Sequence, residues 1–169
     1  MINDSQLFWV CLLLLFPVTF AVEPLPPRNL AKQTNTDCTG LIAFSASGSG
    51  AVLPTGIVTY KHGLVNLSSS WDKELGVFTV ACAGLYQFSF SAYTENNVRM
   101  ILQKRSFNAK QWVPIISTSN GGGSVTILVE VNSGDQVAVF ISKMPYTLQT
   151  NLEHLADVTS FNAYRIAKT

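Results

Sequence analysis

Polar and apolar residues alternate with a period of two along Leu85–Tyr93. The apolar positions of this segment are Tyr86, Phe88, Phe90 and Ala92, and the polar positions between them are Gln87, Ser89 and Ser91. Because successive side chains of an extended chain point to opposite faces, this alternation predicts a strand with one aromatic core face and one polar face.

Short runs of the same kind recur along the chain, separated by glycine, asparagine and serine. The turn segments are Ser47–Gly50, Asn96–Asn97, Asn120–Gly123 and Ser133–Asp135, where residues that tolerate positive φ collect. The predicted strands are Leu41–Ser45, Ile57–Tyr60, Gly76–Val80, Leu85–Tyr93, Arg99–Lys104, Trp112–Ser117, Val125–Val131, Gln136–Ser142 and Thr159–Ile166. Many short strands at this spacing, with no helical pattern, predict an all-β sandwich or barrel.

Val137–Ile141 breaks the alternation, because every position in it is apolar. A strand of this type is buried on both faces, whereas a two-sheet sandwich covers only one face of each strand. We therefore expect a subunit interface on the second face. The low share of charged residues, 12%, points the same way, since soluble proteins average roughly 25%.

The N-terminal segment predicts export from the cytoplasm. Leu7–Phe20 is apolar, and Thr19 and Ala21 supply the small residues of a cleavage site, although this segment has Asp4 and no basic residue. We interpret residues 1–21 as a signal peptide, with a signal anchor as the alternative. Residues 22–37 form a proline-containing leader, and residues 38–169 form one domain that would lie outside the cell without membrane insertion.

Two cysteines, Cys38 and Cys82, remain after the signal peptide. In an oxidising compartment they can form an intrachain disulfide. The sequence leaves two alternatives open: a free, buried Cys82, or a bridge between chains through Cys38.

The segment from Tyr60 to Phe90 resembles the signature of the complement C1q globular-head family. The positions that match its spacing are Asn66, Trp71, Phe78, Gly84, Tyr86, Phe88 and Phe90, and Tyr60 stands where the signature has Phe. Leu41–Ala46, Val129–Val137 and Thr159–Tyr164 resemble flanking segments of the family, with Ala163 in place of the usual glycine.

This resemblance implies a ten-stranded jelly-roll β-sandwich, like that of tumour necrosis factor, which assembles as a homotrimer. It also implies a secreted ligand-binding role. The signature residues are then expected in the core rather than in a site. Because the sequence has no Gly-X-Y repeat, it predicts no collagen stalk, and direct activation of complement proteases is not expected.

The remaining chemistry argues against two broad classes of function. There are only two histidines, His62 and His154, and no nucleophile elbow, phosphate loop or zinc spacing, so no enzyme is predicted. The formal net charge is +1 with no basic stretch, which disfavours nucleic acid as a partner. Gly121–Gly123 is interpreted as a hairpin loop rather than a ligand cradle.

No organic cofactor is indicated, and calcium is the one candidate metal. The resemblance places acidic residues just before the closing strand, where this chain has Glu153 and Asp157. Two carboxylates from each chain around a three-fold axis could supply part of the six to eight oxygens that calcium takes. The alternative is that both are solvated loop acids.

Asn66-Leu67-Ser68 is also a glycosylation sequon.

Basic and aromatic residues interleave around one predicted hairpin. They are Arg99, Lys104, Arg105, Phe107, Lys110 and Trp112. Arginine and exposed aromatic residues are typical anchors of recognition, so we predict that this hairpin contacts the ligand. The alternative is that its charges only keep the strand edges soluble.

Two functions compete. The first is innate-immune recognition of polysaccharide, lipopolysaccharide or altered-self surfaces by multivalent contact. The second is a cytokine-like or synapse-organiser-like ligand of a protein receptor, which a Cys38-linked oligomer would support and an intact Cys38–Cys82 loop would weaken. A matrix role would favour long acidic tracts, which the sequence lacks.

Overall fold

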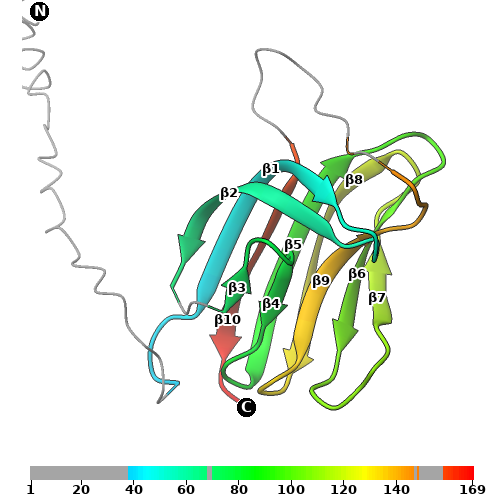
Figure 1. The fold of residues 1–169 in the computed structure, drawn as a ribbon. Coiled ribbons are helices and arrows are strands. Elements are labelled where there is room, and N and C mark those ends of the chain that lie inside the picture. Colours follow the sequence, from blue (N-terminus) through cyan, green and yellow to red (C-terminus); the bar gives the residue numbers. More distant parts are fainter. Residues whose placement is uncertain (1–37, 68–69, 147, 149–157) are drawn as a thin grey trace, which may run out of the picture. The chain divides into compact units, whose positions relative to one another are not determined.

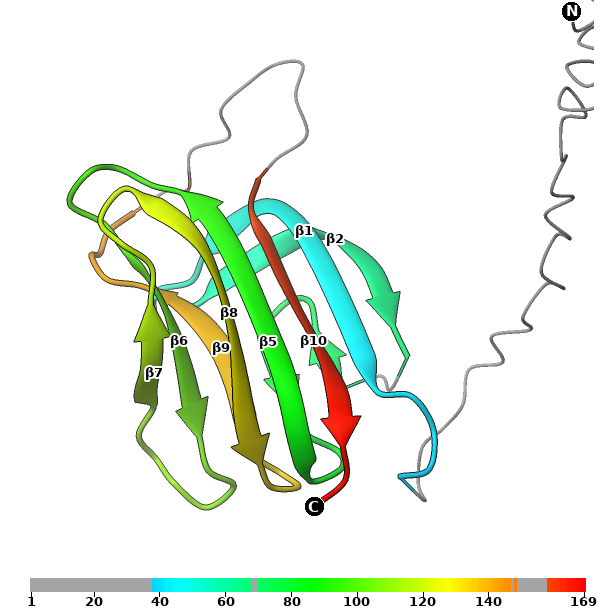
Figure 2. The same cartoon turned by 180° about the vertical axis from the view of Figure 1, so that it is seen from behind.

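A computed structural model describes residues 38–67, 70–146, 148 and 158–169 of the chain. Within these ranges the chain forms strands and no helix (Figures 1 and 2). The strands are β1 (Ala43–Val52), β2 (Val58–Asn66), β3 (Trp71–Asp72), β4 (Val77–Thr79), β5 (Gly84–Tyr93), β6 (Met100–Arg105), β7 (Val113–Ser117), β8 (Gly122–Val131), β9 (Gln136–Ile141) and β10 (Ser160–Ala167). The predicted signal peptide and leader, together with Glu153 and Asp157, lie outside the described residues.

The strands form two antiparallel sheets of five strands that face each other (Figure 1). Sheet 1 has the order β2-β1-β10-β5-β8, and sheet 2 has the order β3-β4-β9-β6-β7. The chain crosses between the sheets several times, and its last strand, β10, lies between β1 and β5. This arrangement confirms the predicted all-β jelly roll with ten strands.

Three details of the strand prediction were wrong. The short strand β3 was missed, because two residues are too few to show a period. Ser47–Gly50 was predicted as a turn, but it lies inside β1, where the register against β2 shifts after Ser45 and again after Ser49. Gly48 adopts a φ of 82° at this irregularity, so glycine here serves a bulge in a continuing strand. Gly122 and Gly123, predicted as loop, likewise belong to β8.

Aromatic rings from both sheets fill the space between them. Phe44 stacks on Trp71 at a centroid distance of 4.7 Å, and Phe161 meets Phe44 edge-on at 4.9 Å. The aromatic signature residues are all buried here, namely Tyr60, Trp71, Phe78, Tyr86, Phe88 and Phe90. Aromatic rings in stacked and edge-to-face contact stabilise the fold by more than the burial of their apolar area alone.

The other two signature positions shape the backbone. The exposed Asn66 donates from Nδ2 to the carbonyl oxygen of Trp71 at 3.3 Å, which ties the end of β2 to the start of β3. Gly84 is buried at the start of β5, where it pairs with Val131 of β8.

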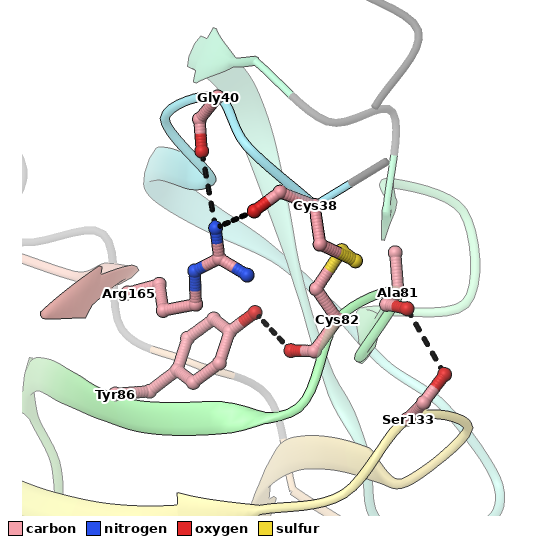
Figure 3. Close-up of a disulfide and its surroundings, with 7 residues drawn as sticks. All are labelled: Cys38, Gly40, Ala81, Cys82, Tyr86, Ser133 and Arg165. Atoms are coloured by element: carbon pink, nitrogen blue, oxygen red, sulfur yellow. Dashed lines mark hydrogen bonds between the residues drawn. A yellow bond between two sulfur atoms is a disulfide. The ribbon is translucent and has the colours of Figure 1, made fainter. Parts of the chain in front are cut away.

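Cys38 and Cys82 form an intrachain disulfide, with an S–S distance of 1.99 Å (Figure 3). Arg165 of β10 donates from Nη2 to the carbonyl oxygens of Cys38 at 2.6 Å and Gly40 at 3.2 Å. The Tyr86 hydroxyl donates to the carbonyl oxygen of Cys82 at 2.7 Å. Burial raises the pKa of Tyr86 to about 12, although the nearby Arg165 acts to lower it. The segment around Cys38, which precedes β1, is thereby held to β5 and β10 at one end of the sandwich.

The expectation of a subunit interface on the second face of β9 was wrong. Val137, Val139 and Ile141 point into the main core. Ala138 and Phe140 point the other way, but they are only 0% and 7% exposed within a single chain. A second apolar cluster covers them, to which Ile57, Val77, Leu53, Ile101 and Trp112 contribute. Side chains of the same molecule therefore supply the missing cover, and the doubly apolar strand needs no partner chain.

Candidate functional site

A groove of about 320 Å³ runs over this second cluster on the outer face of sheet 2. Its lining residues are Leu53, Thr55, Ile57, Leu75, Val77, Arg105, Trp112 and Phe140. They come from the β1–β2 turn, the β3–β4 turn, the start of β4, the β6–β7 hairpin and strand β9. Its volume falls at the lower end of the roughly 300–1,000 Å³ range of small-molecule sites.

The floor of the groove is Phe140. Trp112 meets its ring edge-on at a centroid distance of 5.1 Å, and Ile57 pairs with it through an isolated backbone bridge. The β1–β2 turn is closed by backbone bonds between Leu53 and Ile57 at 2.8 Å and between Gly56 and Leu53 at 2.8 Å. These contacts fix one apolar wall directly beside the floor.

The opposite wall depends on the turn between β3 and β4. Asp72 accepts backbone hydrogen bonds at Oδ1 from Glu74 at 3.0 Å and Leu75 at 2.9 Å. Gly76 follows with a φ of 66°, and a Cβ there would lie 2.3 Å from the carbonyl oxygen of Val58. Only glycine allows this close approach. The turn leaves Leu75 55% exposed on the rim of the groove.

Arg105 is the one charged residue that lines the groove. Its Cζ lies 4.7 Å from the centroid of the Trp112 ring, in cation–π contact. Its Nε donates to Gln136 Oε1 at 3.0 Å, and Nη2 donates to the same oxygen. The groove is therefore apolar along its length, with a guanidinium oriented by an amide and an indole.

The structure brings together only part of the predicted ligand-binding hairpin. Arg105 and Trp112 line the groove. Lys104 instead forms an ion pair with the buried Asp135 at 3.4 Å. The remaining three residues do not line the groove: Phe107 lies over Gly134, Lys110 is exposed, and Arg99 precedes β6. Arg99 is separated from Arg105 by about 20 Å of extended chain.

The sequence did not identify the apolar lining, because its residues come from turns far apart in the chain. The signal in the sequence that could have indicated the groove is Phe140 in the apolar run Val137–Ile141, since its side chain faces away from the main core.

A second hollow, of about 570 Å³, lies at the end of β5 and the start of β8. Its lining comprises Ser91, Ala92, Tyr93, Asn120, Gly121, Gly122, Gly123, Ser124 and Val158. None of these carries a charge, and the predicted hairpin contributes nothing to it. The groove over Phe140 is therefore the stronger candidate site.

The outer face of sheet 1 differs from that of sheet 2, because four strands there present neutral side chains. Three successive rows are neutral, namely Ala43–Tyr164–Gln87–Leu128, Ser45–Asn162–Ser89–Thr126 and Ser47–Ser160–Ser91–Ser124, and the row beyond the first of them holds Glu130 opposite Leu85. Hydroxyls bond across the rows, with 2.9 Å between Ser89 and Thr126 and 2.9 Å between Ser91 and Ser160. We call these rows the neutral face.

Neither a metal centre nor a membrane helix occurs in the part of the chain that the structure describes. No group of three or more His, Cys, Asp and Glu residues there could hold a metal ion. No helix there is long and apolar enough to cross a membrane. The calcium prediction concerns Glu153 and Asp157, which lie outside these ranges, and it stays a prediction.

Comparison with known families matches residues 43–161 to the C1q domain. The chain belongs to the C1q domain family. This membership confirms the resemblance that the signature from Tyr60 to Phe90 indicated. A search of curated proteins found no match.

Solved structures of similar fold include C1q and tumour necrosis factor domains. The globular domain of zebrafish complement 1qA protein is 19% identical, with a TM-score of 0.57, and the match covers 77% of this chain and all of that domain. Eiger TNF from S. frugiperda is 11% identical, with a TM-score of 0.55 over 76% and 94% of the two chains. Murine APRIL is 8% identical, with a TM-score of 0.53 over 75% and 98%. At these identities the C1q domain shares its fold with them.

Proposed function

We propose that this C1q-domain protein is a secreted recognition molecule, which assembles as a homotrimer and binds microbial or altered-self surfaces through several weak contacts at once. The observation that carries the proposal is the contrast between the two outer faces. The neutral face suits contact with other copies, and the groove over Phe140 on the opposite sheet then faces solvent.

The neutral face is unusual for an exposed surface. Its three rows hold no charged side chain, and Leu128 and Tyr164 in them are 54% and 42% exposed. Charged residues are depleted at the cores of interfaces between proteins, whereas free surfaces are rich in them. Twelve neutral positions across four adjacent strands support burial against another chain.

The side of the sandwich between β7 and β8 offers a second apolar surface. Ile115, Val125, Ile127 and Val129 are partly buried there, at the open edges of the two sheets. An edge that packs on a neighbour's face makes a heterologous contact, and such contacts are all satisfied when the copies close a ring. The family resemblance favours a ring of three.

Secretion is supported by the disulfide, since such bonds persist in oxidising compartments. The same disulfide weighs against the receptor-ligand alternative in its Cys38-linked form, because Cys38 is paired within its own chain. Three grooves on one particle would raise weak affinities by about 10²–10⁴ when they engage one surface together.

The test has two parts. Light scattering on the mature protein, in calcium and then in chelator, should give a mass of three chains in both conditions. A mass that falls when chelator is added would support calcium binding at Glu153 and Asp157. Fluorescently labelled trimer should bind whole bacteria far more tightly than it binds soluble monovalent oligosaccharide. A monomer in both conditions, or equal affinity for cells and oligosaccharide, would contradict the proposal.

A further inference from the structure

We propose that the groove over Phe140 binds a single-chain anionic amphiphile, namely a free alkyl carboxylate, with its acid group at Arg105 and its chain over Phe140. This inference rests on the proposed role of the groove as the ligand-contacting site, and it adds the chemical class of the ligand.

The charge state of Arg105 supports an anion at this end. Among the described residues Arg105 forms no ion pair, since the cation paired with an acid nearby is Lys104, with Asp135. Both donors of Arg105 that form hydrogen bonds share Gln136 Oε1, which leaves Nη1 without an acceptor in the described part of the chain. A guanidinium binds a carboxylate through charge-assisted bonds, and here its orientation is already fixed by the Trp112 ring.

The order of side chains along β9 supports an alkyl chain beyond the acid group. Pairing across sheet 2 places Thr79, Gln136 and Arg105 in one row and Val77, Ala138 and Gln103 in the next. Phe140 follows one step further along β9, bridged to Ile57. Along the outer face of β9 the side chains therefore change from Gln136, which holds Arg105, to Ala138 and Phe140, in the same order as an acid followed by its hydrocarbon tail.

The size of the groove supports a small molecule rather than a protein partner. About 320 Å³ holds one short chain, and the exposed Leu75 can close over it from the rim. A protein partner would need an interface of roughly 800 Å² on each side. The groove is too small to provide that area alone.

Calorimetry of the full mature chain with monomeric octanoate, decanoate and dodecanoate tests the chain contribution. Each added methylene should tighten binding about two- to fourfold until the groove is full. Dodecanol, which has the same tail without the charge, should bind roughly tenfold more weakly because it lacks the charge-assisted bond to Arg105. Equal affinities for dodecanol and dodecanoate would overturn the proposal.

Two pairs of variants test the location. Arg105→Gln should reduce dodecanoate binding to the level of dodecanol, whereas Lys61→Gln, which removes an exposed cation from β2, should leave it unchanged. Leu75→Glu should weaken binding of both ligands at least tenfold, whereas Leu64→Glu, at a similarly exposed leucine of β2, should not. Near-ultraviolet circular dichroism confirms that each variant is folded. Wild-type affinity in both groove variants would refute the site.

Fluorescence quenching gives an independent readout. A carboxylate that carries a nitroxide on its chain should quench Trp112 in the wild type, and Trp112→Phe should remove that quenching while the emission of the buried Trp71 persists. Binding to phosphatidylglycerol vesicles without binding of monomeric carboxylates would contradict the proposal, because it would assign the groove to a membrane surface.

Failure of the proposed function can be distinguished from failure of this inference. A protein that is monomeric or does not bind cells, yet binds dodecanoate at Arg105, would refute the multivalent role and keep this ligand. A trimer that binds cells but not dodecanoate would refute this inference alone.

Discussion

The two sheets of this sandwich carry different kinds of side chain on their outer faces. Both sheets bury aromatic residues between them, and each leaves one face outside. Sheet 1 carries three neutral rows of mostly small polar residues there, whereas sheet 2 carries Phe140 and Ala138 under its own Trp112. An apolar residue on an outer face is therefore no sign of a partner chain, and a face without charge is the better indicator.

The largest effect is expected from a charge in the middle of the neutral face. Ser89→Lys places an ammonium between Asn162 and Thr126 in each copy of a trimer. An unpaired buried charge costs several kcal/mol, so the mass by light scattering should fall from three chains to one. Ser106→Lys, in the β6–β7 loop, is the matched control and should stay trimeric. A trimeric Ser89→Lys protein would show that this face stays in solvent.

Loss of the disulfide should weaken both sheets alike. Because Cys38 and Cys82 are separated by 44 residues, loop closure predicts a loss of about 4 kcal/mol in the free energy of unfolding for Cys38→Ala with Cys82→Ala. Urea titration measures this loss, and the mass of the folded particle should not change. A change of mass without a loss of stability would mean that the disulfide acts on the assembly rather than on the fold.

Trp112→Ala tests whether the cover of β9 comes from its own chain. The substitution removes the edge-on contact with Phe140 and the cation–π contact with Arg105. A half-buried ring of this size predicts a loss of about 2 kcal/mol in stability, below the cost for a fully buried aromatic residue. Thermal unfolding should show the loss, while light scattering shows an unchanged trimer. Dissociation of the trimer would restore β9 as an interface strand.

The smallest effect should be a gain. The hydroxyl of Tyr60 is buried and has no hydrogen-bond partner among the described residues. Tyr60→Phe removes this unpaired group and restores the residue that the family signature has, so stability should rise by about 1 kcal/mol. Tyr86→Phe is the contrasting variant, because it loses the bond to Cys82 and should be destabilising. A stability loss in both would mean that Tyr60 has a partner.

The amino-acid sequence was enough to predict the class of fold, nine of the ten strands in the described residues and the buried signature residues. These follow from local periodicity and from a spacing of aromatic residues that one segment carries. Its predicted ligand-contacting hairpin also included two residues that line the groove, Arg105 and Trp112, since an arginine near an aromatic residue is visible within one hairpin.

The cysteine pairing, the cover of β9 and the position of the groove became known only from the three-dimensional arrangement of the strands. Each of these depends on residues far apart in the chain, such as Leu53, Leu75 and Phe140, which meet over one sheet. Periodicity gives the face on which a side chain lies, but it does not say which other segment packs against that face. For the same reason the neutral face became visible only when the register of four strands placed its serines in rows.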